Sequence, residues 1–482
     1  MKSDIILLAL LPLLAACGGD APQNDNPATN TQTGTSSAAN DPRPPVYLEG
    51  LYATSSAADK EAYDLFDDDP NTGWQTQPGT GPDEGIMLYF ADAQMLQSIQ
   101  VLAEEGSFHV EKALLQTYVN GALGESGKAG EYIPLGDKPV KSLYIRFAKT
   151  GFEHETIKRE KKGATVQIET FPREEYVGIQ SLNILNNKGE PLRLVPPARV
   201  RGSVSASSTL EPEIAYSPAN LFDSRKEFVW VEGNETTSGE GDTISFGFVT
   251  PVRITAVQIW NGYQRSDEHF AANVRLRDFE FGAKGGPVST YTLRDTKAGQ
   301  KIQLSTVAEG DSFILKIKNT YPGKRYKDLV ISDIVFFDGE RPFVLVSKLP
   351  QQHKVLLRSR VEGSPLLQLL NRRISNVVNE EDVVTFQSLI LRSDGTFVLY
   401  SNDVLPDDTE SQTLADGNWE LMTANGANAT VRVFGKWNNV SDFADYYKGK
   451  TTQTDIRIFS DELITDGSTV KGKRVIGTFY VR

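Results

Sequence analysis

The chain has 482 residues, a formal net charge of −13 and a single cysteine; at about 100–200 residues per domain, this length predicts roughly three domains. Hydrophobic residues make up 39% of the chain, which is enough to build packed cores. One cysteine excludes an intramolecular disulfide. The acidic balance disfavours binding to a nucleic-acid backbone, which requires clustered Lys and Arg. We therefore expect no nucleic-acid partner.

The N-terminus carries a short apolar segment that leads into small residues and the cysteine. The apolar run 5–14 is too short to span a bilayer, so it predicts a secretory signal. Residues 14–18, with the sequence LAACG, resemble the lipobox of bacterial lipoproteins. The resemblance implies a signal peptide over residues 1–16 and lipidation of Cys17. An ordinary signal peptide with an incidental cysteine is the alternative.

The residue after the cysteine is Gly18, whereas an aspartate there would resemble an inner-membrane retention signal. The implied location is the bacterial cell envelope, as an outer-membrane lipoprotein that faces the periplasm or the cell surface. The membrane partner is contacted through the lipid anchor. Residues 17–46 are polar and rich in Gly, Asn, Ser, Thr and Pro, so we expect a flexible tether.

Two segments that follow the tether repeat the same motifs in the same order. Residues 64–67 (DLFD) and 220–223 (NLFD) are each followed by a tryptophan, Trp74 and Trp230, seven residues after the aspartate. An alternating strand pattern comes next, and each copy ends in a period-2 strand and a Gly-containing turn. We therefore predict two homologous domains, 47–197 and 198–347, with both tryptophans packed in the cores.

The strands expected in both copies are short and rich in β-branched and aromatic residues. The predicted fold class is mainly β, with tandem β-sandwich (jelly-roll) domains and a C-terminal β-barrel-like domain. The repeated Leu-Phe-Asp and Trp element resembles the discoidin (coagulation factor 5/8 type C, galactose-binding-like) family. In the second copy, YSPANLFD (216–223), WVEG (230–233) and IWNGY (259–263) also resemble the glycan-binding jelly-roll module attached to secreted NAD-glycohydrolase toxins.

This resemblance implies a carbohydrate site in the second domain, because the first copy lacks the Asn-Gly-Tyr motif. A sugar site combines aromatic faces with a few convergent polar groups, and the polar segment 261–273 is expected to be a surface loop. The expected aromatic residues are Trp260, Tyr263 and Phe270, with anchoring of the loop as the alternative for Tyr263. The expected polar contacts come from Asn234, Asn261, Arg265, Asp267 and Asn273.

An acidic turn in the first copy is a candidate calcium site. Members of the discoidin family often hold a structural calcium ion near this turn, and Asp67, Asp69 and Asn71 offer the oxygen ligands that Ca²⁺ prefers. An acidic turn capped by its own side chains is the alternative. We expect no cofactor apart from this candidate calcium ion.

Residues 348–482 form the third predicted domain, which is β-rich. The apolar spacing over 364–378 predicts a helix, and Ser393-Asp394-Gly395 predicts a hairpin turn. LRSDGTF (391–397), followed by GNWEL (417–421) and an alternating strand, resembles small bacterial lipocalin-like barrels. Such a barrel holds a small apolar ligand or is filled by side chains, and we expect it to be filled.

The sequence contains no Gly-x-Ser-x-Gly, phosphate-binding glycine loop, His-Glu-x-x-His or Cys-x-x-Cys motif, so we expect no enzyme activity. The motifs together predict a membrane-anchored surface lipoprotein that binds carbohydrate through its discoidin-like modules. The alternative is a non-catalytic envelope assembly or scaffold lipoprotein that binds another protein.

Overall fold

The computed structural model describes residues 42–482 apart from short gaps. The gaps are residues 68, 70, 79–83, 104–112, 150–154, 162–163, 171–175, 235, 363–364, 369, 372, 381–382, 406–407, 426–427, 438–450, 460–468, 471–472, 475–477 and 481–482. The signal peptide, Cys17 and most of the tether lie outside the described residues. Residues Pro42–Arg482 form one compact unit. None of the helices described in it is long and apolar enough to cross a membrane.

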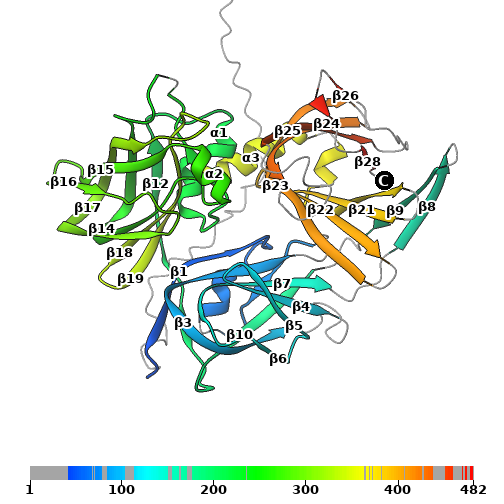
Figure 1. Ribbon diagram of the computed structural model, residues 1–482, viewed down its shortest axis with the longest axis horizontal. Coiled ribbons are helices and arrows are strands. Elements are labelled where there is room, and N and C mark those ends of the chain that lie inside the picture. Colours follow the sequence, from blue (N-terminus) through cyan, green and yellow to red (C-terminus); the bar gives the residue numbers. More distant parts are fainter. Residues whose placement is uncertain are drawn as a thin grey trace, which may run out of the picture. The chain divides into compact units, whose positions relative to one another are not determined.

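The first part of this unit is a β-sandwich (Figure 1). Its elements are β1 (Pro45–Ala53), η2 (Ala62–Phe66), β2 (Trp74–Gln75), β3 (Gly85–Ala103), β4 (Leu114–Val119), β5 (Ala122–Gly127), β6 (Tyr132–Pro134), β7 (Pro139–Lys149), β10 (Gly178–Asn186) and β11 (Arg193–Val195). Between β7 and β10, β8 (Glu155–Lys161) and β9 (Ala164–Thr170) form a separate two-stranded sheet. The long strand β3 pairs first with β1 and β7 and then with β10 and β6, so it contributes to both layers. β11 pairs in parallel with β1.

The second part repeats this plan. Its elements are β12 (Ala198–Ala206), α1 (Glu213–Tyr216), η3 (Pro218–Phe222), β13 (Trp230–Val231), β14 (Thr243–Asn261), α2 (Asp267–Ala272), β15 (Arg275–Ala283), β16 (Val288–Thr292), β17 (Gln300–Tyr321), β18 (Val330–Asp338) and β19 (Arg341–Val346). The long strand β14 pairs first with β12 and later with β18, while β17 runs beside it throughout. β19 pairs in parallel with β12. Buried phenylalanines fill the core. The rings of Phe246 and Phe336 pack edge to face, with 5.3 Å between their centres.

The two tryptophans that follow the repeated Leu-Phe-Asp motif occupy equivalent places in the two sandwiches. Trp74 lies opposite Ile179 on β10, and Trp230 lies opposite Ile331 on β18. Both side chains are fully buried. Each indole N–H donates to a backbone carbonyl, that of Ser55 at 2.9 Å and that of Ser208 at 3.2 Å. The predicted core role of both tryptophans is therefore confirmed.

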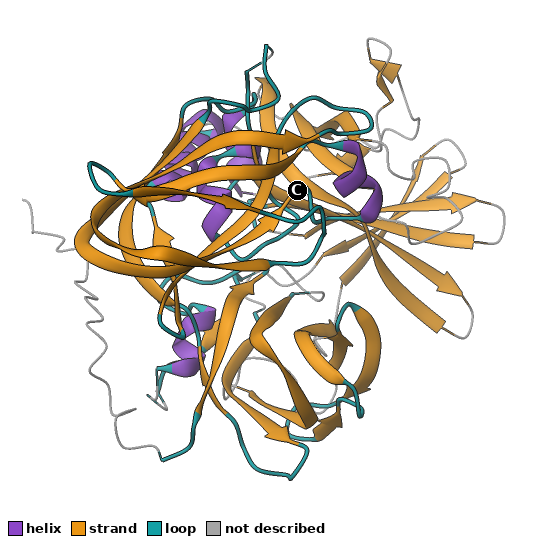
Figure 2. Ribbon diagram, turned by 60° about the vertical axis from the view of Figure 1, so that its left-hand side comes forward, coloured by secondary structure: helices purple, strands orange, loops and turns teal. Residues whose placement is uncertain are grey.

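The third part is a curled, barrel-like sheet. Its elements are α3 (Leu349–Val361), η4 (Pro365–Gln368), β20 (Arg373–Glu380), β21 (Val383–Leu391), β22 (Thr396–Leu405), β23 (Asp408–Asn425), β24 (Asn428–Trp437), β25 (Thr451–Phe459), β26 (Thr469–Val470), β27 (Lys473–Arg474) and β28 (Thr478–Tyr480). β20 to β25 follow one another as antiparallel neighbours, and β28 pairs in parallel with β25. Figure 2 shows how little of the described chain is helical. The predicted mainly β fold is confirmed.

One local prediction in this third part is wrong. The helix expected over 364–378 is a short 3-10 turn, η4, followed by strand β20, and the longer helix α3 lies upstream. Ile374, Val377 and Val378 are β-branched, and their segment pairs along its length with β21. The predicted turn at 393–395 is present, with Gly395 at φ +87° and Leu391 opposite Phe397.

Buried polar side chains connect the three parts. Glu84, before β3, pairs with Arg392, after β21, at 3.0 Å, and both side chains are almost fully buried. Glu49 on β1 accepts a hydrogen bond from Gln258 on β14 at 2.8 Å. Because these groups are desolvated, each depends on its partner.

Candidate functional site

The segment 261–273, predicted as a surface loop, contains the short helix α2. Ser266 caps the helix by accepting a hydrogen bond from the backbone N–H of His269 at 3.2 Å. At the other end, the Asn273 side chain donates to the carbonyl oxygen of His269 at 2.8 Å. Asn273 is buried, so its amide holds the end of the helix.

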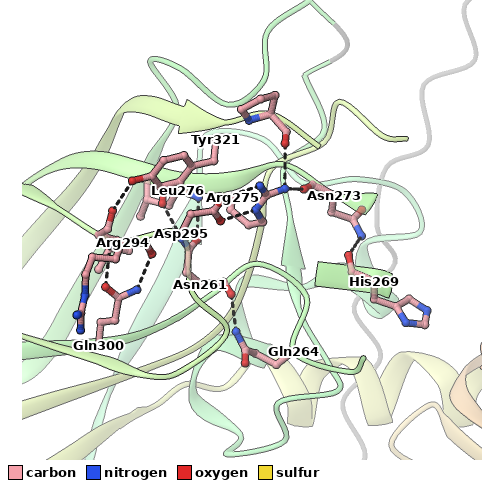
Figure 3. Close-up of polar contacts among 12 residues, drawn as sticks. Asn261, Gln264, His269, Asn273, Arg275, Leu276, Arg294, Asp295, Gln300 and Tyr321 are labelled. Carbon is pink, nitrogen blue, oxygen red and sulfur yellow. Dashed lines mark hydrogen bonds and ion pairs between the residues drawn. The ribbon is translucent and has the colours of Figure 1, made fainter. Parts of the chain in front are cut away.

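Asn261 fastens the start of this segment to strand β15. Its side chain is fully buried, donates to the carbonyl oxygen of Leu276 at 2.6 Å and accepts from the Leu276 N–H at 2.7 Å (Figure 3). Gly262 follows with φ +66°, and a Cβ there would lie 2.6 Å from Arg275 and 2.9 Å from Phe270. Only glycine fits this turn without displacing its neighbours.

Arg275 organises the region, and the sequence reasoning missed it. Its guanidinium forms two bonds of 2.8 Å with the Asp295 carboxylate (Figure 3). It also donates to the carbonyl oxygens of Asn273 at 2.7 Å and Pro322 at 3.0 Å. The Phe270 ring lies 5.2 Å from the guanidinium carbon. Phe270 and Asn273, two predicted site residues, thus meet around one buried arginine.

Trp260 lies apart from this arrangement. Its side chain is 4% exposed, and the Lys226 ammonium lies 3.9 Å from the ring centroid. The same ammonium lies 3.5 Å from the Tyr89 ring and 3.8 Å from the Glu49 carboxylate. Burial lowers the pKa of Lys226 to about 8. In this structure the indole packs inside the protein and presents no open face.

Tyr263 and Arg265 are held by neighbouring groups. The Tyr263 ring lies 5.2 Å from the His269 ring, and burial raises the pKa of its hydroxyl. The Arg265 side chain is 7% exposed and forms an ion pair with Asp416 on β23. A guanidinium with this partner orients the loop against the third part of the chain.

Asn234 and Asp267 are the more accessible of the predicted polar residues. The Asp267 side chain is 94% exposed and pairs with Lys297 at 3.0 Å. Asn234 is half-buried, and its oxygen accepts from the Thr236 N–H at 3.1 Å and hydroxyl at 2.7 Å. Asn234 lies in the loop before β14, whereas Asp267 begins α2 after it.

Three tyrosines and a leucine lie close together near α2. We call this group, which consists of Leu210, Tyr216, Tyr263 and Tyr326, the loop-end cluster. Leu210, Tyr216 and Tyr263 pack on three buried valines, one just before β13, one in β13 and one at the start of β18. Tyr326 is brought close by its backbone N–H, which donates to the carbonyl oxygen of Ala272 at the end of α2 at 2.8 Å. Burial raises the pKa of Tyr216, and the charges of Tyr263, Asp328 and Tyr326 add to this shift.

The sequence analysis did not predict two tyrosines of this cluster, Tyr216 and Tyr326, as site residues. Tyr216 begins the YSPANLFD motif, so the sequence could have indicated it as a site residue. Tyr326 lies in a separate loop more than 60 residues downstream of Tyr263, and only the fold brings it near. Both residues are half-buried.

The candidate calcium turn uses its carboxylates for its own hydrogen bonds. Asp67 accepts from the Asp69 N–H at 3.0 Å and the Thr72 hydroxyl at 2.8 Å. Asp69 accepts from the backbone and side-chain nitrogens of Asn71, both at 2.9 Å. Within the described residues, no three His, Cys, Asp or Glu side chains converge as metal ligands. These contacts fit a self-capped turn, and the calcium site at Asp67, Asp69 and Asn71 stays a prediction.

The geometry of the second part, a two-layered sandwich with its loops gathered around α2 and β13, defines a discoidin-like domain. Residues 198–337 match the family described as NAD glycohydrolase translocation F5/8 type C domain. This segment is therefore an F5/8 type C domain, as its motifs predicted. No curated protein matches the chain.

Several solved structures resemble the chain at low identity. The CBM32-1, CBM32-2 and M60 catalytic domains of Clostridium perfringens ZmpB share 9% identity with it, with a TM-score of 0.24, and the match covers 64% of this chain and 38% of that one. The family 32 module of C. perfringens NanJ, in complex with galactose, shares 11% identity at a TM-score of 0.23 over 28% of this chain and 93% of the module. The CBM32 of AlyQ, in complex with 4,5-unsaturated mannuronic acid, shares 14% identity at a TM-score of 0.22, covering 28% and 95%.

Proposed function

We propose that this protein is a lipid-anchored, non-catalytic envelope protein that binds carbohydrate through its F5/8 type C domain. The observation that carries the proposal is the loop-end cluster, in which half-buried tyrosine rings stand beside polar loops. Aromatic rings offer faces for the C–H groups of a sugar, and polar side chains beside them fix its orientation.

Tyr216, Tyr263 and Tyr326, which are all partly exposed, supply the aromatic surface in this proposal. Tyr263 is held against His269 and packs on the same valines as Tyr216. Asn234 and Asp267 are the polar groups with access to solvent. Asn261, Asn273 and Arg275 serve the proposed site by holding its backbone in place, because their side chains are bonded to loop carbonyls.

Binding is tested on the full mature chain with a glycan array, followed by titration of the best ligand. Tyr326→Ala should weaken binding at least tenfold and leave the circular dichroism spectrum unchanged. Tyr132→Ala is the matched control, because this tyrosine is 53% exposed in the first sandwich, away from the loop-end cluster. Unchanged affinity of Tyr326→Ala would remove the site assignment. An array without any bound glycan, together with capture of a defined envelope protein, would favour the scaffold role.

The anchor rests on the lipobox-like sequence around Cys17. Acyl chains on this residue would hold the protein at the outer membrane, because more than one chain gives stable anchoring. Labelling of cells with radioactive palmitate should mark the wild-type chain and not Cys17→Ser. Labelling that persists in Cys17→Ser would refute the anchor without bearing on carbohydrate binding.

A further inference from the structure

A cleft of about 720 Å³ lies where the three parts of the described chain meet. Its walls include Tyr52 of the first sandwich, Arg225 and Phe228 of the second, and Arg392 and Asp394 of the third part. This volume falls within the range of small-ligand sites. None of the tyrosines of the loop-end cluster lines it, so the cleft is a separate place on the molecule.

Arg225 is held in this cleft in a fixed plane. Its guanidinium carbon lies 4.1 Å from the centre of the Phe228 ring and 5.5 Å from that of Tyr52. Its Nε bonds to the Glu227 carboxylate at 3.3 Å. The side chain is 14% exposed, so most of it is already desolvated and little freedom remains to be lost when a ligand binds.

With Nε bonded to Glu227, the two terminal nitrogens are the remaining donors of this guanidinium. Within the part of the chain that the structure describes, no hydrogen-bond acceptor lies within reach of its two terminal nitrogens. These nitrogens are also absent from the atoms sealed from solvent. A planar guanidinium that is fixed on its faces and open at its edge matches a carboxylate, which accepts two parallel N–H bonds.

The surrounding charges permit an anion there. Arg392 lies on the same wall, with its charge paired to that of Glu84. Burial raises the pKa of Asp223 well above its usual range, which favours its neutral form. Asp394 stays ionised, because hydrogen bonds from Thr396 and the charges of the two arginines outweigh the effect of burial and lower its pKa. One oxygen of Asp394 accepts from the Thr396 N–H at 2.9 Å and hydroxyl at 2.7 Å.

We propose that this cleft binds a carboxylate-bearing saccharide whose carboxylate is held by the open edge of Arg225. The cleft is much larger than a lone carboxylate, and its walls mix aromatic rings with hydroxyl and amide groups, as a sugar ring requires. The saccharide part of this inference rests on the proposed carbohydrate-binding function, whereas the carboxylate part rests on Arg225.

The test is calorimetric titration of the full mature chain with a panel of uronic acids and sialic acid, with their neutral counterparts, and with acetate. At least one acidic sugar should bind, at least tenfold more tightly than both its neutral counterpart and acetate. A panel in which no acidic sugar binds overturns the proposal. Equal binding of the neutral sugar overturns the carboxylate part, and equal binding of acetate overturns the saccharide part.

Variants locate the binding. Arg225→Met should reduce affinity for the acidic sugar at least tenfold, and Arg225→Lys should reduce it less, because the charge remains without the planar fork. Arg277→Met is the matched control, since this arginine is half-exposed and pairs with the adjacent Asp278. If the Arg225→Met variant does not fold, the Arg225→Lys variant tests the proposal alone. Unchanged affinity of Arg225→Lys for the acidic sugar would then overturn the role of the planar guanidinium. Tyr326→Ala should keep full affinity for the acidic sugar, which separates this site from the loop-end cluster.

Discussion

The buried ion pair between Glu84 and Arg392 offers a strong test of how the first and third parts of the chain depend on each other. The Glu84 side chain is 0% exposed and that of Arg392 is 4% exposed, with 3.0 Å between the paired atoms. At that separation and an effective dielectric constant near 20, the Coulomb attraction is about 5–6 kcal/mol. Desolvation of both groups offsets much of this attraction.

Removal of one side chain takes the opposite charge of this pair from the other, which stays buried. We expect Arg392→Met and Glu84→Leu each to lower the free energy of unfolding by about 3–5 kcal/mol. Glu84→Leu also leaves the Thr54 hydroxyl without its carboxylate partner, which adds about 1 kcal/mol. The double variant replaces both charges by apolar groups, so its loss should be smaller than that of either single variant.

The assay is urea unfolding followed by tryptophan fluorescence. Trp419 is a local reporter, because its indole N–H donates to the carbonyl oxygen of Arg392 at 2.9 Å. Arg253→Ala is the control, since its ion pairs with Glu309 and Asp338 join side chains that are at least 48% exposed, and it should cost less than about 1 kcal/mol. A double variant whose loss equals the sum of the single losses would refute the reasoning.

Three further predictions use the same urea assay. Arg275→Lys should lower the free energy of unfolding by about 2–4 kcal/mol, because lysine cannot keep both the two-point contact with Asp295 and the two carbonyl contacts. A loss below about 1 kcal/mol would contradict this. Trp74→Phe and Trp230→Phe should each lower the free energy of unfolding by about 1–3 kcal/mol, because the carbonyl oxygen of Ser55 or Ser208 loses its indole donor; a loss confined to one copy would argue against equivalent roles. Burial raises the pKa of Glu232 to about 7 in the folded chain, above the unfolded value of 4.5. The proton therefore stabilises the fold below about pH 4.5, and this contribution is lost as the pH rises through about 7. Glu232→Gln should match the wild type near pH 4.5 and exceed it by roughly 1–3 kcal/mol near pH 8; parallel pH profiles would exclude this carboxyl as the cause.

Local patterns predicted the sandwich class and the places of Trp74 and Trp230, because strand alternation and turn residues are encoded by neighbours in the chain. The turn that ends at Gly395 was predictable for the same reason. The helix expected over 364–378 was wrong, because pairing with β21 overrode an apolar spacing that strands and helices share.

The candidate site was less accessible to this reasoning, because its contacts join distant segments. The sequence predicted Trp260 as an aromatic face of the sugar site. Only the folded structure shows that the Lys226 ammonium lies over its ring. Arg275 gave no signal, since its partners Asp295 and Pro322 lie in later loops. The binding roles predicted for the loop residues remain predictions, which the Tyr326→Ala titration addresses.

The parallel pairing of the first and last strands in each sandwich has a mechanical consequence. β1 pairs with β11 through three residue pairs from Pro45↔Arg193, and β12 pairs with β19 through four from Ala198↔Phe343. A force that pulls the start of β1 away from the end of β11 loads these bonds in shear, all at once, instead of opening them one by one. Only Pro196 and Pro197 separate β11 from β12, so the load passes to the next sandwich with little slack.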